Sequence, residues 1–420
     1  MKSLKIPFLA VFTLLSMISY AQEFDAKLQL RPRYEFRNGF KAPIPYGVEP
    51  ASFVSQRSRL NLNFTQDKLV TKFTIQNIRV WGDVNSTAVS DVNGIEVFEA
   101  WAMYNFDENW SAKMGRHEIS YDNQRILGGL DWAQQGQSHD ALRLTYKSEK
   151  SHLDVGYALS AMGETLVETP YTVASYKNMQ FAWYHTSFNK LNGSLLFLNT
   201  GYQFANVNAD LFVDYMQTFG TYLNTSGKSW DANAWFYGQT GKSNTNSVSA
   251  WDAAANFNYV VTEKFKIGIG YEFLSGKSQL DTSTDVKSFY PLFGTNHGFN
   301  GYMDYFYVGN YRNTVGLQDL FLKFNYNVSK WQFALMPHVF NAANTVVDGN
   351  AQTMESYLGT EVDITAGYAL QKYINITGGY SQMFATDTMQ LLKGGDVDHT
   401  NNWAWIMINV DPTIFTFKKQ

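Results

Sequence analysis

Arginine is distributed very unevenly along this chain of 420 residues. Nine of the ten arginines lie before residue 144, and none lies between Arg143 and Arg312. A guanidinium presents a planar fork of donors that matches a carboxylate in two hydrogen bonds. A ladder of such groups therefore suits a solute that carries repeated carboxylates, or small anions. The arginines expected to share one wall are Arg31, Arg33, Arg57, Arg59, Arg79, Arg116, Arg125 and Arg143.

The wall opposite the arginines is expected to be acidic. Asp231, Asp252, Glu272, Glu361 and Asp363 all fall at the polar positions of alternating segments. An acidic wall opposite the arginines would create a transverse field that orients charged solutes. The alternative is that the arginines pair with nearby carboxylates and only stiffen the structure, and the two roles are compatible. The carboxylates in question are Asp25, Glu35, Glu96, Glu99 and Glu118.

The sequence gives no sign of a local catalytic, metal or cofactor motif. None of the seven histidines sits in an HExxH array, and no GxSxG elbow, P-loop or dinucleotide-binding glycine motif occurs in a suitable context. Cysteine is absent, which excludes disulfides and cysteine-ligated metals. We therefore expect no enzyme activity and no cofactor, and a formal charge of −4 gives no reason to expect nucleic-acid binding. A Ser-His-Asp site is not local in sequence, so a membrane lipid hydrolase stays open as an alternative.

Strict alternation of polar and apolar residues identifies the elements that carry these side chains. In 24–37 the odd positions are polar or charged and the even positions apolar, and the pattern recurs at 55–64, 251–259, 265–273 and 358–366. Such alternation predicts strands with one wet and one apolar face. The eighteen predicted strands are 24–37, 55–64, 68–80, 95–106, 110–121, 138–147, 151–160, 178–188, 191–200, 217–224, 230–240, 248–259, 265–275, 316–327, 331–341, 357–369, 373–384 and 402–410.

The links between these strands alternate in length. Links 65–67, 107–109 and 189–190 are tight, whereas 122–137 and 276–315 are long. This places the long links at one end, which is typical of outer-membrane barrels with short periplasmic turns and long extracellular loops. The prediction is an all-β, antiparallel transmembrane barrel with lipid on its apolar face and a wet lumen, because only a closed sheet satisfies its backbone in lipid. A soluble β-sandwich is the alternative.

The chain begins like a secreted protein. Lys2 and Lys5 precede the apolar run 6–18, and Ser19-Tyr20-Ala21 provides the small residues of a cleavage site. We expect residues 1–21 to be a signal peptide and residues 22–420 to form the barrel. The aromatic loop 276–315 has two interpretations, an inward constriction of the pore or a cap packed on neighbouring loops.

Several segments resemble the alginate-export family of outer-membrane porins. The most specific is GRHEISYDNQRILGGLDWAQQGQSHDALRL at 115–144, joined by RPRYEFR, SQRSRLNLNF, FEAWAMYNF and YLGTEVDITAGY. FYPLFGTNHGFNGYMDYFYVG is similar to the Bacteroidetes branch of that family. The resemblance implies an eighteen-stranded monomeric barrel with an electropositive constriction that passes a polyuronate. The residues that fit this description are the eight arginines named above together with Lys27 and Lys72.

The predicted function is therefore passive passage of anionic saccharides, such as uronates or alginate, through the outer membrane of a Gram-negative bacterium. The expected partners are outer-membrane lipid, the anionic saccharide and the barrel-assembly machinery. The alternative is a barrel without transport, either a lipid hydrolase or a structural or adhesive protein. The end of the chain, IFTFKKQ, lacks a terminal aromatic residue, so Phe415 or Phe417 is expected to serve in the assembly signal.

Overall fold

Nearly every regular element of the protein is a β-strand. The computed structural model describes residues 22–88, 90–173 and 175–419, and the expected signal peptide lies outside them. The regular elements are β1 (Gln22–Asn38), β2 (Ala51–Gln66), β3 (Leu69–Val80), β4 (Glu96–Asn105), β5 (Trp110–His117), β6 (His139–Lys147), β7 (Ser151–Leu159), β8 (Asn178–Phe188), β9 (Leu191–Ala205), β10 (Leu211–Ser226), β11 (Trp230–Ser243), β12 (Asn246–Val260), β13 (Phe265–Leu274), the 3-10 turn η1 (Asn296–Gly298), β14 (Leu317–Val328), β15 (Trp331–Ala342), β16 (Tyr357–Gln371), β17 (Ile374–Ala385), α1 (Asp387–Lys393), β18 (Asn401–Val410) and β19 (Thr413–Lys419). Within the described residues, no helix has the length and apolar character needed to cross a membrane.

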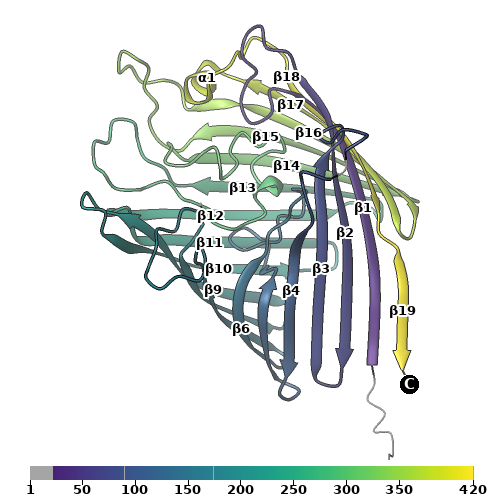
Figure 1. Ribbon diagram of the computed structural model, residues 1–420. Helices are drawn as coiled ribbons and strands as arrows, with labels where there is room; N and C mark the ends of the chain where they lie inside the picture. The colour runs from purple at the N-terminus through teal and green to yellow at the C-terminus, as the bar shows by residue number, and fades with distance from the viewer. Residues whose placement is uncertain (1–21, 89, 174, 420) are drawn as a thin grey trace, which may run out of the picture.

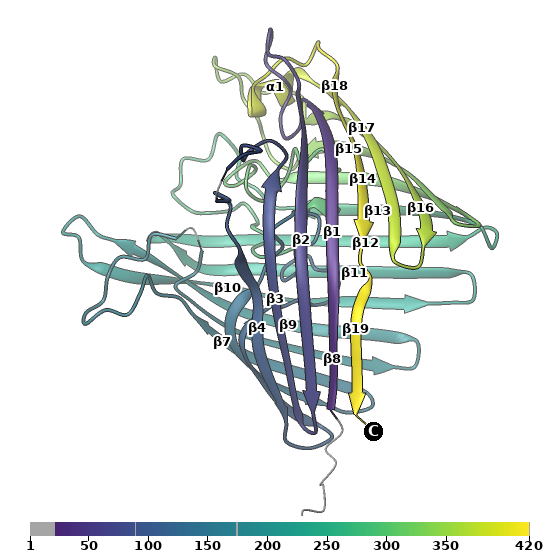
Figure 2. The same cartoon turned by 45° about the vertical axis from the view of Figure 1, so that its right-hand side comes forward.

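The strands form one closed antiparallel barrel (Figures 1 and 2). From β1 to β18 each strand pairs with the next one along the chain, and β1 also pairs with β18 along 30–38 and with β19 along 22–27. β18 and β19 are thus two halves of one strand that is interrupted at Asp411 and Pro412, where proline cannot donate to the ladder. The barrel therefore has eighteen strands, which confirms the predicted fold, and every predicted strand range overlaps an observed one.

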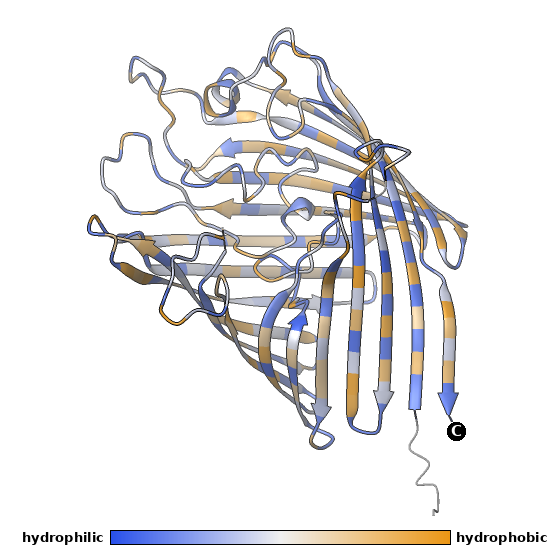
Figure 3. Cartoon of the chain, in the orientation of Figure 1, coloured by the Kyte–Doolittle hydropathy of each residue, from blue (hydrophilic) through white to orange (hydrophobic). Residues whose placement is uncertain are grey.

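The two faces of the wall follow the predicted alternation, which is visible as stripes along the front strands in Figure 3. On the outer face Leu28, Leu30, Ile269 and Ile364 are exposed. The side chains between them point into the barrel, because successive residues of a strand face opposite sides. A girdle of aromatic pairs also lies on the outer face at the short-turn end, and its members are Trp110, Tyr146, Trp331 and Tyr368.

The two ends of the barrel differ in their connections. At one end the strands are joined by tight turns such as 67–68, 189–190 and 329–330, and at the other by loops such as 118–138 and 275–316 (Figure 1). The long-loop end is itself uneven. There β9–β10 and β11–β12 are joined by only 206–210 and 244–245, and these long strands continue outward as hairpins, at the left of Figures 1 and 2.

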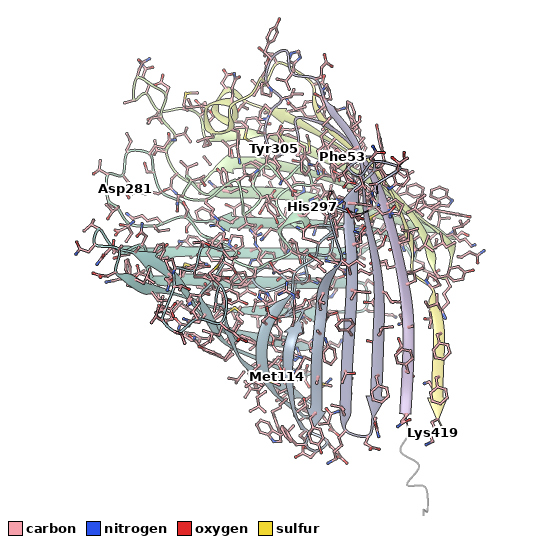
Figure 4. All side chains as sticks on the ribbon, in the orientation of Figure 1. Phe53, Met114, Asp281, His297, Tyr305 and Lys419 are labelled. Atoms are coloured by element: carbon pink, nitrogen blue, oxygen red, sulfur yellow. The ribbon has the colours of Figure 1, made fainter. Side chains whose placement is uncertain are left out.

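Two of the long loops, the β5–β6 loop (118–138) and the β13–β14 loop (275–316), fold back into the barrel. Their apolar side chains build the core there, since Ile126, Met303 and Tyr305 are at most 2% exposed. Figure 4 shows His297 and Tyr305 among the elements inside the wall, whereas Asp281 of the same loop lies on a part that projects outward. The β13–β14 loop thus fits both interpretations drawn from its sequence, because it enters the barrel and packs on another loop.

Candidate functional site

A cluster of four arginines lies on the lumen face of β1 and β2. Arg31 and Arg57 are direct cross-strand partners, and Arg33 and Arg59 lie two residues away on their own strands. All four are at most 9% exposed. The strict alternation of both strands therefore brings the four guanidinium groups to one part of the wall, called the arginine wall below.

The β5–β6 loop supplies most of the partners of the arginine wall. The Arg31 Nη2 atom donates to Gln134 Oε1 at 3.0 Å, and Arg33 Nη1 donates to the Trp132 carbonyl at 2.7 Å. The Arg33 guanidinium also lies over the Trp132 ring, 4.0 Å from its centroid. The loop therefore presents neutral oxygens and an aromatic face to the cations.

Arg57 and Arg59 hold the next part of the same loop. Arg57 Nη1 donates to the Gln134 carbonyl at 3.4 Å, and Arg59 Nη2 donates to the Gln135 carbonyl at 3.1 Å. Gly136 follows at a φ of +65°, and a Cβ atom there would meet Arg59 Nη2 at 2.7 Å. Glycine is thus needed for both the backbone conformation and the close approach.

Asp131 is the loop carboxylate that contacts the arginine wall. Its Oδ1 lies 2.8 Å from Arg57 Nη2 and its Oδ2 lies 3.2 Å from Arg31 Nη1, while the side chain stays 75% exposed. Desolvation opposes ionisation, but the charges of Arg57 and Arg31 hold the pKa of Asp131 below its usual value. Asp131 therefore bridges the two facing guanidinium groups.

The carboxylates of the later strands meet on the part of the lumen wall that β12 to β16 form. Asp252, Glu272, Glu361 and Asp363 are at most 2% exposed. Asp319 of β14 joins them, and its Oδ1 lies 2.8 Å from His338 Nδ1, whose Nε2 is 3.7 Å from Asp363 Oδ2. We call these five carboxylates the acidic wall. Asp231 lies apart from it, near the short-turn end, in an ion pair with Lys266.

Arg125 of the β5–β6 loop crosses to the acidic wall. Its Nε lies 2.9 Å from Glu272 Oε1 and 3.5 Å from Asp252 Oδ2. Its two terminal nitrogens donate to Asn296 Oδ1 and Asn300 Oδ1, both at 3.1 Å. Arg125 therefore ties both inner loops to β12 and β13.

Backbone N–H groups of the β13–β14 loop complete the contacts of the acidic wall. Met303 N donates to Glu361 Oε1 at 2.7 Å, and Tyr302 N donates to Asp363 Oδ2 at 3.3 Å. Gly301 precedes them at a φ of +84°, and a Cβ atom there would meet Glu361 Oε2 at 2.6 Å. The two walls hold their loops by opposite chemistry, since the arginines bind carbonyl oxygens and the carboxylates bind N–H groups.

The two inner loops also pair with each other across the lumen. Leu127 and Phe293 form a parallel bridge, in which Gly128 N donates to Phe293 O at 3.0 Å. Trp132 stacks on His297 with ring centroids 4.3 Å apart. The loops therefore form one cross-linked unit that spans from the arginine wall to the acidic wall.

Below this unit the lumen remains open toward the short-turn end. A cavity of about 440 Å³ lies there, with Arg143, His152 and Asp154 in its lining. Arg143 lies 3.5 Å from Asp154, and Lys72 forms an ion pair with Glu99. Lys27 is exposed on the lumen face of β1.

Three residues of the expected basic ladder lie elsewhere. Arg79 and Arg116 share the outer face with their cross-strand partners Gln56 and Asp140, and Arg116 Nη1 lies 2.9 Å from an Asp140 oxygen. Each stands one residue off the inward parity of its strand. Arg125 lies inside but on the acidic side, because a long loop is not bound to the wall formed by its flanking strands.

Sequence reasoning also missed residues that the site depends on. Asp319 and His338 have the inward parity of β14 and β15, so alternation contained a signal for them. Lys113, whose Nζ lies 3.8 Å from the Trp101 ring centroid, has inward parity in β5. Asp131 and Gln134 lie in a loop, where no periodicity reveals which groups will face the arginines.

The family of the chain follows from a comparison with family models. A model described as "Alginate export" matches residues 24–404. The chain belongs to the alginate-export family. This confirms the resemblance drawn from the sequence, while the assignment to the Bacteroidetes branch stays a prediction. A comparison with curated proteins gives no match.

Solved structures of outer-membrane proteins share the fold of this alginate-export family member. Acinetobacter baumannii OccAB4 is 11% identical, with a TM-score of 0.64 over 94% of this chain and 98% of that one. Pseudomonas aeruginosa OccK1 (OpdK) is 10% identical, with a TM-score of 0.62 over 94% and 99%. OpdK has also been solved with vanillate, in a structure with 11% identity and a TM-score of 0.61 over 94% and 99% of the two chains. At such identities the likeness concerns the barrel alone. In outer-membrane barrels the long loops lie at the extracellular end and the short turns at the periplasmic end, and the two ends are named accordingly below.

Proposed function

We propose that this member of the alginate-export family is an outer-membrane channel for passive diffusion of anionic saccharides, with uronates and polyuronates such as alginate as its solutes. The proposal includes neither catalysis nor a cofactor. It treats the protein as a monomer that the barrel-assembly machinery inserts into the outer membrane.

The observation that carries the proposal is the incomplete neutralisation of the arginine wall. Among the residues that the structure describes, its four guanidinium groups contact two carboxylates, Asp131 and Glu35, and Glu35 also pairs with Arg37. The remaining partners are backbone carbonyls and glutamine side chains, which satisfy hydrogen bonds without cancelling charge. The wall therefore keeps an excess of positive charge in surroundings of low dielectric constant, where its potential reaches further than in water.

The positive charge acts on the lumen through the β5–β6 loop rather than by direct exposure. Buried guanidinium groups cannot hand a carboxylate from one to the next, as an open ladder would. They can attract anions to the rim of the inner loops, which favours rapid and weak binding. Lys27, exposed on the lumen face of β1, provides a directly accessible cation on the periplasmic side.

The comparisons with known proteins also support the proposed solute class. The matching family model is described as "Alginate export", and alginate is a polyuronate. One protein of the same fold has been solved with vanillate, an aromatic carboxylate. Both solutes carry a carboxylate on a six-membered ring, so a ring carboxylate is the common chemistry that we assign to this channel.

The proposal is tested by reversal potentials of single channels in a salt gradient. Arg57→Ser with Arg59→Ser should reduce the preference for chloride over potassium and raise the conductance, because the loop loses two of its anchors. Arg79→Ser with Arg116→Ser removes the same charge from the outer face and should leave selectivity unchanged.

Two outcomes would contradict the proposal. Unchanged selectivity in the Arg57 and Arg59 double variant, with normal insertion, would make these arginines purely structural. A native barrel without conductance steps would favour a lipid hydrolase or a structural barrel instead. Liposome swelling with galacturonate, galactose and dicarboxylates would then rank the solutes of a conducting channel.

A further inference from the structure

A second cavity lies at the extracellular end, on the side of the barrel away from the arginine wall. It has a volume of about 510 Å³ and lies between β9–β12, the β7–β8 loop and the β13–β14 loop. This volume is within the range of about 300–1,000 Å³ that is usual for small-molecule sites. The arginine wall is formed by β1 and β2, so the two features are independent parts of the lumen.

Six aromatic side chains are among the residues that line this cavity. They come from three separate parts of the chain, namely the β7–β8 loop, the extracellular end of β9 and the β13–β14 loop. Aromatic rings provide flat apolar faces against which the face of a sugar or aryl ring can pack. The aromatic residues used in the argument are Tyr171, Tyr202, Phe204, Tyr290 and Phe293.

Arg312 places one cation at the cavity. Its guanidinium lies over the Tyr290 ring, with Cζ 3.8 Å from the centroid. Among the described residues it makes no hydrogen bond within 3.5 Å and no ion pair within 4.0 Å, unlike the four arginines of the arginine wall. Arg312 is exposed, and partial desolvation of its guanidinium lowers its pKa, while nearby Tyr202 acts in the opposite direction. A guanidinium that has an aromatic neighbour but no acceptor is available to a carboxylate from outside.

The walls of the cavity are fixed before any ligand arrives. Gln239 of β11 holds the β13–β14 loop by both ends of its amide, since Nε2 donates to Tyr290 O at 2.7 Å and Oε1 accepts from Tyr290 N at 2.9 Å. Ser288 Oγ also donates to the Thr314 carbonyl, which ties the two arms of the loop together. Binding then requires little ordering of the protein, which favours affinity.

From these observations we propose that the cavity is a binding site for one carboxylated six-membered ring, with the carboxylate on Arg312 and the ring against the aromatic walls. The inference rests on the proposed function and extends it, because it adds a specific extracellular site for the solute. Such a site concentrates the solute at the mouth of the channel, before or after its passage past the inner loops.

The test is calorimetric titration of the folded, detergent-solubilised barrel with three probes: galacturonate, galactose and benzoate. Galacturonate should bind on the order of tenfold or more tightly than galactose, because galactose cannot form the charge-assisted hydrogen bonds to Arg312. Benzoate, a carboxylate on an aromatic ring, shows whether the site prefers aryl carboxylates or sugar carboxylates. Binding as tight as that of galacturonate assigns the site to aryl carboxylates, weaker binding assigns it to uronates, and both results support a ring-carboxylate site.

Single substitutions test whether galacturonate binds in this cavity. Arg312→Gln should reduce galacturonate affinity on the order of tenfold and leave galactose unaffected. Tyr290→Leu retains the backbone bonds to Gln239 and should weaken binding while the barrel still shows heat-dependent gel mobility. Arg79→Gln is the matched control, because it removes an arginine at the same end of the barrel but on the outer face.

Equal binding of galacturonate and galactose, or full binding in a folded Arg312→Gln variant, would overturn the inference. Its failure is separable from failure of the proposed function. An anion-selective channel that does not bind galacturonate at Arg312 refutes the site alone, whereas a barrel without conductance refutes the channel.

Discussion

Arg31 and Arg57 face each other on neighbouring strands, a position at which like charges destabilise a sheet. The structure offsets this repulsion with Asp131, which contacts both guanidinium groups from the β5–β6 loop. The loop and the arginine pair therefore depend on each other, since each would lose its main partner without the other.

This dependence predicts a response to pH. The pKa of Asp131 is lower in the folded protein than its unfolded value of about 3.9, so the ionised carboxylate stabilises the docked loop above that value. The stabilisation is lost as the pH falls through the lowered pKa. Single-channel recordings should show added current fluctuations in that acidic range, and Asp131→Asn should show them already at neutral pH. If the native protein and the Asp131→Asn variant give identical recordings at neutral pH, Asp131 does not hold the loop.

Parity along the strands predicted residue positions well where alternation is long and unbroken, as in β1 and β2. It failed at Arg79 and Arg116 because they lie at strand ends next to long loops, where the sequence alternates weakly and an assignment shifted by one residue exchanges the faces. It could not place Arg125 or Asp131, since loop residues have no periodic relation to the wall.

The assignment of the lipid face makes its own prediction. Ile269 is 48% exposed on the outer face of β13. Lysine at this position should reduce the stability of the barrel in vesicles, measured as the free energy of unfolding, by about 2–4 kcal/mol. Urea titration of vesicle-inserted protein measures this loss, with Ile269→Leu as a control close to native. A stable lysine variant would show that the two faces are assigned the wrong way round.

At the scale of elements, the strands were predictable and the paths of the loops were not. Each strand carries its own signal, the period-two alternation, whereas the inner loops are held by groups far away in sequence. Arg31 and Gln134, or Arg125 and Asn296, are more than one hundred residues apart. Only the folded barrel brings them together, although the glycines at 136 and 301 mark the points of closest approach.

The joint role of Arg125 predicts that the two inner loops loosen together. Arg125→Gln leaves Asp252 and Glu272 buried without their cation and should cost about 3–5 kcal/mol of stability in urea titration. Limited proteolysis should then cleave both the β5–β6 and the β13–β14 loop. Arg116→Gln breaks an exposed pair and should stay within about 1 kcal/mol of native stability. Cleavage confined to one loop would contradict a shared anchor.

At the scale of the whole molecule, the barrel closes through β18 and β19 on β1. β19 covers the periplasmic half of β1, so its removal exposes a row of unpaired backbone groups in lipid. Deletion of 413–420 should therefore abolish insertion, measured by heat-dependent gel mobility after refolding into vesicles. Deletion of Lys419 and Gln420 alone keeps Phe415 and Phe417 and should insert normally. Efficient insertion of the longer deletion would mean that β18 alone closes the barrel.

The hairpins of β9–β10 and β11–β12 give the extracellular mouth two unlike halves. On one side the rim consists of two separately paired hairpins, β9–β10 and β11–β12, and on the other it consists of loops. Each hairpin opens only by breaking several hydrogen bonds at once, so we expect this half to act as a firmer lip than the loops. In the proposed channel, the mouth would therefore adapt to solutes of different size on its loop side, while the lip would present a constant surface to them.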